Sequence, residues 1–330
     1  MHQLAFALLT TLLSTAAMAT AAASAPESKP PHAKAKPVWQ ESFSDADWRL
    51  AWNSKRDGKW HIYQLDAAGS PVNLTRHVFD DWLWSTRDGQ LFALTTERKE
   101  DEPRGWRGRR LDASGSPTGA IANEKLSDGF VDCLADGSLC AGEVVIEKKK
   151  RIALFNPDGS RRQLLGDGSH DDADPQFSPD GSRLLFRSNR GGSWEIHVGN
   201  RDGSDAKAIT SHPDNNALPE AAYGGEGPAR FSPDGQRITW MRELPGAGND
   251  VWVMDVDGSN PRNLTGDQAG GDGYPSFSPD GRLIAFDSKR SGDNEIYVMD
   301  ADGGNVRRVT DSPGSDLAAM WVRVPKEAGK

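Results

Sequence analysis

A five-residue motif that recurs along the chain constrains its fold more than any other feature. Phe-Ser-Pro-Asp-Gly occurs at 177–181, 231–235 and 277–281. Degenerate copies end at Asp88-Gly89 and Asp136-Gly137, and Phe43-Ser44-Asp45 resembles a decayed first copy. Successive Asp-Gly pairs are 44 to 54 residues apart. Self-similarity at a period of several tens of residues is the signature of solenoids and propellers.

Each repeat also has a fixed internal order of turns and strands. Ser-Pro-Asp-Gly predicts a tight turn, because Pro presets φ at the second turn position and Gly accepts a left-handed conformation. In the last full repeat this turn is followed by the apolar strand 283–286, a polar turn, the strand 295–299 and a third turn that leads to Val309-Thr310. The strands are rich in β-branched and aromatic residues. Three turns join four antiparallel strands, which is one propeller blade.

Counting the third strands gives the number of blades. They are predicted at 62–65, 110–111, 152–155, 195–198, 251–254 and 295–299. The sequence therefore predicts an all-β, six-bladed β-propeller of four-stranded antiparallel blades. The alternative is an open solenoid of β-hairpins, which needs polar capping repeats that are not visible in the sequence.

The ends of the chain are expected to close the ring. Residues 316–321 align with 272–277, so they supply an inner strand that no further blade follows. Residues 37–43 also fit such a strand. Either segment would complete the first blade, and the sequence leaves the choice between them open.

The first residues predict export. An apolar stretch from Leu4 to Leu13 precedes Ala17-Met18-Ala19, a small-residue pattern at which signal peptides are cleaved. We expect a signal peptide over 1–19, a flexible leader over 20–36 and the propeller over 37–330. An uncleaved anchor is the alternative, although the apolar run is short for a bilayer span. The protein would then be periplasmic or secreted, with no stable membrane span after cleavage.

The charge of the chain bears on its partners. The formal net charge is -9 and the isoelectric point is near 5.3, which argues against a nucleic-acid partner because phosphate binding needs clustered Lys and Arg. Neither a Gly-x-Ser-x-Gly elbow nor a His-Glu-x-x-His pair occurs in the sequence. The commonest hydrolase and zinc-protease sites are therefore not indicated.

Alignment of the repeats places an acidic residue five positions before the same inner-strand position in every copy. The six are Asp80, Asp128, Asp172, Glu226, Asp272 and Asp316. Inner strands line the channel of a propeller, so these carboxylates are expected to form a ring near one mouth. In a structural interpretation each accepts N–H groups of the adjacent loop. In a functional one the ring attracts Ca2+ or the basic end of a partner peptide. No cofactor is required in either case.

Two cysteines are compatible with a disulfide in an exported protein. In the hairpin register Cys133 matches Phe177 and Cys140 matches Leu184, positions that face each other across the Asp136-Gly137 turn. The alternative is a pair of small buried thiols.

Histidines and tryptophans supply the remaining candidates. His197 takes the place of aromatic residues in other third strands, so we expect it to pack rather than to catalyse. His170, which lies beside three aspartates, is the best candidate for a metal cluster, although a solvated loop would look the same. The three aspartates are Asp171, Asp172 and Asp174.

The tryptophans have two interpretations. Trp52 and Trp240 fall in second strands, with Phe286, and are expected to be core. Three others fall in the least regular repeat and are candidates for an exposed recognition patch. These are Trp82, Trp84 and Trp106.

Over residues 37–322 the repeat resembles the WD-like repeat of the TolB-like propellers. The resemblance rests on Phe-Ser-Pro-Asp-Gly, the aromatic strand, Asp-x-Asp-Gly and the closing Leu-Thr. It departs from TolB in one respect, since no α/β domain is expected between the leader and Trp39. The resemblance implies a periplasmic scaffold that binds a cell-envelope protein or peptide at the axial channel, with a cation as a further candidate ligand, and we expect a monomer.

Similar propellers also occur in oligogalacturonate lyases and beside the hydrolase domain of prolyl oligopeptidases, so the fold fixes no activity. The alternative function is therefore a polysaccharide lyase or peptide hydrolase that uses channel carboxylates and a metal. We favour the binding function over the enzyme.

Overall fold

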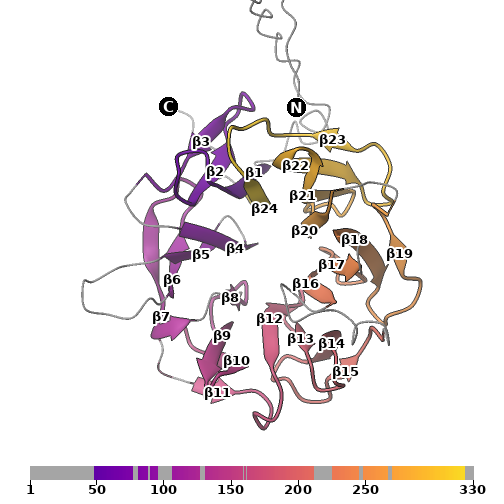
Figure 1. The fold of residues 1–330 in the computed structure, drawn as a ribbon. Coiled ribbons are helices and arrows are strands. Elements are labelled where there is room, and N and C mark those ends of the chain that lie inside the picture. The colour runs from indigo at the N-terminus through magenta and orange to yellow at the C-terminus, as the bar shows by residue number, and fades with distance from the viewer. Residues whose placement is uncertain are drawn as a thin grey trace, which may run out of the picture. The chain divides into compact units, whose positions relative to one another are not determined.

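A computed structural model describes ten stretches of the chain. They are 48–76, 81–87, 90–95, 106–126, 131–158, 160, 162–211, 225–244, 248–266 and 270–323. Within the compact unit 36–330, the strands form six four-stranded antiparallel sheets arranged in a ring (Figure 1). This confirms the prediction of a six-bladed propeller. No helix in the described stretches is long and apolar enough to cross a membrane.

The strands follow one another around the ring, and within each blade they run from the channel outward. Blade 1 contains β24 (Asp316–Arg323), β1 (Trp48–Ser54), β2 (His61–Leu65) and β3 (Pro71–Asn73). Blade 2 contains β4 (Asp81–Arg87), β5 (Gln90–Thr95), β6 (Trp106–Leu111) and β7 (Pro117–Leu126). Blade 3 contains β8 (Val131–Cys133), β9 (Cys140–Ile146), β10 (Lys149–Phe155) and β11 (Arg162–Leu164).

The other three blades have the same order. Blade 4 contains β12 (Asp172–Phe177), β13 (Arg183–Ser188), β14 (Glu195–Asn200) and β15 (Lys207–Ala208). Blade 5 contains β16 (Glu226–Phe231), β17 (Arg237–Leu244), β18 (Gly248–Asp255) and β19 (Arg262–Asn263). Blade 6 contains β20 (Asp272–Phe277), β21 (Leu283–Ser291), β22 (Asp293–Asp300) and β23 (Arg307–Arg308).

The C-terminal strand closes the ring. β24 pairs antiparallel with β1, with Trp48 opposite Arg323 and Ser54 opposite Asp316. It is thus the inner strand of blade 1, which settles the choice that the sequence left open. The competing segment 37–43 lies outside the described residues.

The core lies between the blades, whose apolar faces pack on one another. One cluster joins Leu283 and Ile296 of blade 6 to Trp52 and Trp321 of blade 1. The side chains of Trp52, Trp240 and Phe286 are fully buried, as the sequence predicted for second strands. Burial of large aromatic side chains between neighbouring sheets is the main source of stability in such a ring.

Hydrogen bonds from side chains to backbone reinforce the junctions between blades. At the junction of blades 1 and 2, the Asn53 amide donates to the carbonyl oxygen of Leu83 and accepts its N–H. At the junction of blades 3 and 4, Asp132 accepts the N–H of Phe177. These bonds satisfy buried polar groups that the sheets leave unpaired.

Aspartates in the turns accept hydrogen bonds from hydroxyl and N–H groups of the same turn. Asp180 accepts the hydroxyl of Ser178 and the N–H of Ser182. These hydrogen bonds lower the pKa of Asp180 to about 2. Equivalent bonds lower the pKa of Asp112, Asp136 and Asp234, so these turns stay anionic well below neutral pH.

The two cysteines lie opposite each other on β8 and β9. Their sulfur atoms are joined across a sequence separation of 7 residues, with Cα atoms 4.0 Å apart. The bridge closes the hairpin around the Asp136-Gly137 turn at the inner edge of blade 3.

We expect this disulfide to form in the exported protein. Because the loop is short, its loss in a Cys133→Ser, Cys140→Ser double variant should lower the free energy of unfolding by only about 2 kcal/mol. Intact-mass measurement before and after reduction should show a gain of two hydrogens in the unmodified chain and none in the variant. An unmodified chain whose mass does not change on reduction contradicts the bridge.

Candidate functional site

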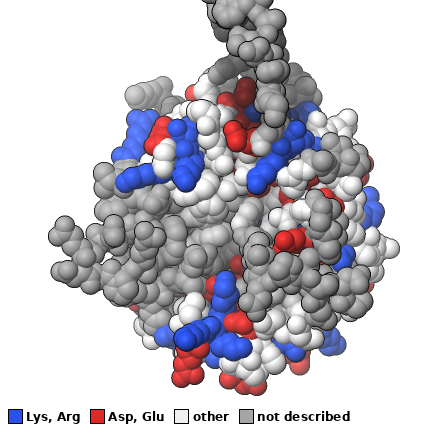
Figure 2. Space-filling view, viewed as in Figure 1, with Lys and Arg blue, Asp and Glu red and all other residues white. Residues whose placement is uncertain are grey.

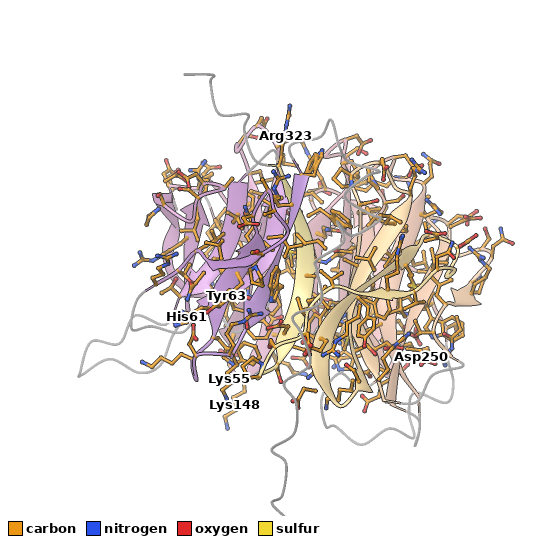
Figure 3. The ribbon with its side chains drawn as sticks, turned by 90° about the horizontal axis from the view of Figure 1, so that it is seen from above. Lys55, His61, Tyr63, Lys148, Asp250 and Arg323 are labelled. Atoms are coloured by element: carbon orange, nitrogen blue, oxygen red, sulfur yellow. A yellow bond between two sulfur atoms is a disulfide. The ribbon has the colours of Figure 1, made fainter. Side chains whose placement is uncertain are left out.

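The two faces of the ring carry different turns. Lys55 and Lys148, in turns between second and third strands, lie on one face, and Arg323, at the end of β24, lies on the other (Figure 3). We call the first the mouth face, because the inner strands enter the channel there. The opposite face carries the Ser-Pro-Asp-Gly turns.

Four of the six acids in the proposed ring lie in the described part of the chain. Asp172, Glu226, Asp272 and Asp316 are each the first residue of an inner strand, and all four are buried. They are therefore at equivalent places on blades 4, 5, 6 and 1, as the alignment predicted. Asp80 and Asp128 lie outside the described residues.

Each of these four carboxylates has an arginine partner on its own blade. In blade 4, Arg190 donates to Asp172 at 3.0 Å and to the hydroxyl of Ser188 at 2.9 Å. In blade 6, Arg290 donates to both oxygens of Asp272, at 3.1 and 3.0 Å. It also donates to Ser288 at 2.9 Å.

Blades 1 and 5 use the same chemistry with one variation. In blade 1, Arg56 donates to Asp316 at 2.9 Å and to Ser54 at 2.9 Å. In blade 5, Arg242 occupies the place of the serine and lies 3.6 Å from Glu226.

Aromatic rings hold the arginines in place. The Arg290 guanidinium lies 5.2 Å from the ring centroid of Phe286 and 5.0 Å from that of Tyr297. Arg56 lies 4.4 Å from the centroid of Tyr63. A guanidinium clamped between a carboxylate and an aromatic face is well ordered, and it neutralises the acid beside it.

This pairing changes the expected electrostatics of the mouth. The four acids contribute buried ion pairs rather than a negative ring, and burial raises the pKa of Asp316 despite its arginine. Asp172, Asp272 and Asp316 accept hydrogen bonds from arginine side chains, whereas the sequence suggested the N–H groups of the adjacent loops. In the described stretches no three His, Cys, Asp or Glu side chains come close enough together to hold a metal.

The aspartates next to His170 in the sequence interact with other residues. Asp171 accepts hydrogen bonds from the side chain of Asn189 and the N–H of Lys150. Asp174 forms a buried ion pair with Arg187, and His170 is exposed. The neighbouring acids are thus committed to separate contacts.

A hydrogen bond crosses the channel below the mouth, at a level that we call the waist. Arg230 of β16 donates at 2.8 Å to the carbonyl oxygen of Trp84, on β4. Burial lowers the pKa of Arg230 to about 10, and the charges of Asp132 and Asp174 oppose this shift. A cavity of about 10 Å³ remains beside these residues, room for at most one water molecule.

Aromatic residues form the mouth above this waist. The rings of Trp82 and Trp60 meet edge to face, with their centroids 4.8 Å apart. The ring centroids of Trp82 and Trp84 are 5.5 Å apart. Tyr274 of blade 6 packs against the same cluster. The prediction of an exposed patch is wrong for Trp84, which is buried because the inner strand turns its side chain toward blade 3. Trp82 is half-buried. The side chain of Trp106 lies outside the described residues.

Exposed lysines of blades 1, 3 and 6 lie on the mouth face. Figure 2 shows Lys and Arg side chains gathered in separate clusters on this face. Lys55, Lys148 and Lys289 are exposed there, with Asp57 and Glu147 close by in sequence. The rim is therefore mixed in charge rather than acidic.

His197 has the packing role that its position predicted. Its ring stacks on Phe186 with centroids 5.6 Å apart, and only 3% of the residue is exposed. Burial lowers the pKa of His197, so the ring stays neutral in the core.

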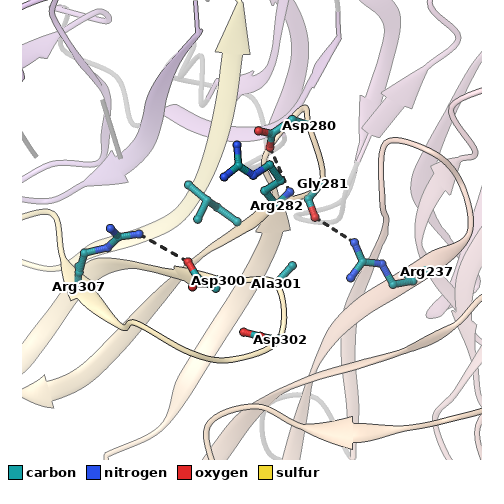
Figure 4. Close-up of a pocket in the computed structure, with 9 residues that line it drawn as sticks. Arg237, Asp280, Gly281, Arg282, Asp300, Ala301, Asp302 and Arg307 are labelled. Carbon is teal, nitrogen blue, oxygen red and sulfur yellow. Dashed lines mark hydrogen bonds and ion pairs between the residues drawn. The ribbon is translucent and has the colours of Figure 1, made fainter. Parts of the chain in front are cut away.

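A second cavity lies on the opposite face between blades 5 and 6 (Figure 4). It measures about 430 Å³ and is lined by charged residues of the turns. Arg237 donates to the carbonyl oxygen of Gly281 at 2.9 Å, and Arg307 lies 3.8 Å from Asp300. Arg237 thus crosses the blade junction to a backbone carbonyl, and the Arg307–Asp300 pair lies within blade 6.

The arginine partners had a signal in the sequence that the alignment of acids did not use. Ser54, Ser188 and Ser288 are each followed two positions later by an arginine. This Ser-x-Arg pattern falls at the end of the second strand in three blades. Read together with the acid that begins the inner strand, it would have predicted the ion pairs.

Comparison with known proteins finds a resemblance over part of the chain. Residues 222–326 match the sequence profile of the TolB beta propeller domain. An uncharacterized protein of Agrobacterium fabrum is 33% identical over 128 residues, 38% of this chain and 42% of that protein. The Tol-Pal system protein TolB of Anaeromyxobacter dehalogenans is 37% identical over 112 residues, 34% of this chain and 23% of that protein. The matches thus span less than half of either relative.

The fold also resembles that of TolB proteins. The crystal structure of TolB from Acinetobacter baumannii superposes with a TM-score of 0.67 at 18% identity, over 86% of this chain and 70% of that one. At this identity the likeness shows the fold alone. Taken with the sequence match over residues 222–326, it supports a TolB-like β-propeller.

Proposed function

We propose that this protein is a binding propeller of the bacterial cell envelope, whose mouth face receives a segment of a partner protein. The family match supports a scaffold of the Tol-Pal type, since one relative is named for that system. The alternative, an enzyme that uses channel carboxylates and a metal, has less support because the described carboxylates are held in ion pairs.

The hydrogen bond across the waist carries the proposal. Since Arg230 bridges β16 and β4 through Trp84, a segment that enters the channel would stop at the mouth, against Trp82 and Tyr274. Half-buried aromatic side chains are common anchors in protein interfaces. The lysine-bearing turns would then set the approach of the partner. Such binding needs no Ca2+, although a cation at the mouth remains compatible with it.

Site-specific photo-cross-linking in the cell envelope tests this proposal. A photoreactive phenylalanine at Lys55, Lys148 or Lys289 should cross-link one and the same partner. The matched positions Asp136, Asp202 and Asp302 are exposed on the opposite face and should give no adduct. Adducts from the opposite face, or from neither face, would contradict binding at the mouth.

The proposal includes export, with residues 1–19 removed and 20–36 left as a leader ahead of the propeller. N-terminal sequencing of the protein from the periplasmic fraction should begin at Thr20. A chain that keeps Met1 and stays with the membrane would show that the apolar segment is an anchor instead.

A further inference from the structure

The junction between blade 6 and the closing strand contains a buried carboxyl group. Asp287 of β21 is only 5% exposed, and its Oδ1 accepts the N–H of Ala318 at 2.9 Å. Gly273 of β20 leaves the space for it, because a Cβ there would lie 3.3 Å from Oδ2 of Asp287 and 3.4 Å from the sulfur of Met241. The carboxyl group is thus packed into the junction at which the ring is joined.

The N–H group that Asp287 binds belongs to an irregular part of β24. Ala318 has φ +53°, a conformation that L-residues rarely adopt, and the register of β24 against β1 shifts around it. The N–H of Ala318 lies in the part of β24 that has no paired residue on β1. Asp287 therefore holds a strained residue of the closing strand, at the point where the strand is least well fixed by its own sheet.

The charges of Asp272 and Lys289 act on Asp287, and further acids lie on the neighbouring strands. Asp272 of β20 is paired with Arg290, and Asp316 of β24 is paired with Arg56. Glu295 of β22 is paired with Arg308, and Lys289 lies two positions further along β21. Asp272 and the two acids on β24 and β22 thus have arginine partners.

The ionised form of Asp287 is disfavoured in this environment. Burial raises the pKa of Asp287 to about 7; the N–H of Ala318 opposes the shift, the charge of Asp272 adds to it, and Lys289 opposes it more weakly. Burial also raises the pKa of Asp316 at the start of the same strand. Both shifts act in the same direction on the closing strand.

We propose that Asp287 makes closure of the ring pH-dependent, so that β24 is held most tightly when this carboxyl group is protonated and more loosely when it is ionised. A protonated carboxyl group keeps a carbonyl oxygen that accepts the N–H of Ala318, and it avoids the cost of burying a charge. When β24 detaches, the group reaches water and ionises at an ordinary pKa.

The sign of the effect follows from linkage. Because the pKa of Asp287 is higher in the closed ring than in the open one, its contribution to closure is complete below the open-state pKa of about 4. The contribution decreases as the pH rises from about 4 to about 7, and the free energy of closure no longer changes with the ionisation of Asp287 above that pH. Neutral to mildly alkaline conditions should therefore favour opening of the junction.

Amide hydrogen exchange of β24, read by mass spectrometry on the full chain, tests this proposal. After correction for the intrinsic exchange rate, opening of Asp316–Arg323 should increase about tenfold between pH 6 and pH 8. In Asp287→Asn, whose side-chain oxygen still accepts the N–H of Ala318, most of this increase should disappear. The amides of β16 serve as an internal reference in the same spectra.

Asp132→Asn is the matched control, because Asp132 also accepts an N–H across a blade junction, from Phe177. In this variant β24 should keep its tenfold dependence on pH. The proposal is overturned if exchange of β24 in the unmodified protein does not change with pH after correction, or if Asp287→Asn keeps the full change.

Discussion

Ending the chain at Pro313 is expected to abolish the folded ring. This removes β24, and with it the inner strand of blade 1. Ala319 and Trp321 pack with Trp52 in one core cluster, and Met320 and Val322 pack with Ala51 in another. At about 1.5 to 3 kcal/mol for each large buried side chain, the loss is about 6 kcal/mol or more, comparable to the whole stability of many domains.

Circular dichroism and thermal unfolding of the purified chain measure the outcome. The truncated protein should lack a cooperative transition, and a peptide that spans 314–323, added in excess, should restore one. The restored transition separates loss of the strand from a general failure to fold. A truncated chain with the melting temperature of the full chain would show that another segment completes blade 1.

Replacing Asp172 and Asp272 together by Lys is expected to lower the melting temperature by about 10 °C. Each substitution places a second cation beside a half-buried arginine, Arg190 or Arg290. Breaking a buried pair costs about 3 kcal/mol, and the partial exposure of both arginines reduces this to about 2 kcal/mol for each blade, to which like-charge repulsion adds. For a chain of this size the sum corresponds to about 10 °C.

The double Asn variant is the matched control, since it removes the charge without reversing it and should cost less than half as much. Thermal unfolding of the three proteins, with and without added Ca2+, gives both readouts. If the Lys variant kept its melting temperature but lost binding of Ca2+ or a partner, the acids would serve a ligand and not the blades.

The blades were predictable because their signal is local. Phe177 to Gly181 and its two copies combine a turn with the inner-strand aromatic, and that chemistry is legible in five residues. Even the irregular blades were located, since residues 110–111 lie in β6 and 152–155 in β10. The choice between 37–43 and β24 was open because both segments fit the same inner-strand pattern.

The site was less predictable because each acid is paired with an arginine that lies far away in the sequence. Arg190 is 18 residues from Asp172, and Arg56 is 260 residues from Asp316. An alignment of one residue type finds a ring of acids and cannot show what neutralises them. The waist is a second example, since Arg230 meets Trp84 across 146 residues.

Closure of the ring by β24 can be tested directly with an engineered disulfide. Trp48 and Arg323 are partners in the β1–β24 ladder at its outer end. In a Trp48→Cys, Arg323→Cys variant, oxidation should give an intramolecular bridge, faster migration in a non-reducing gel, and a gain of about 5 kcal/mol in the free energy of unfolding because the bridge closes nearly the whole chain. Oxidation that gives only intermolecular dimers, or no bridge at all, would contradict a ring closed by its C-terminal strand.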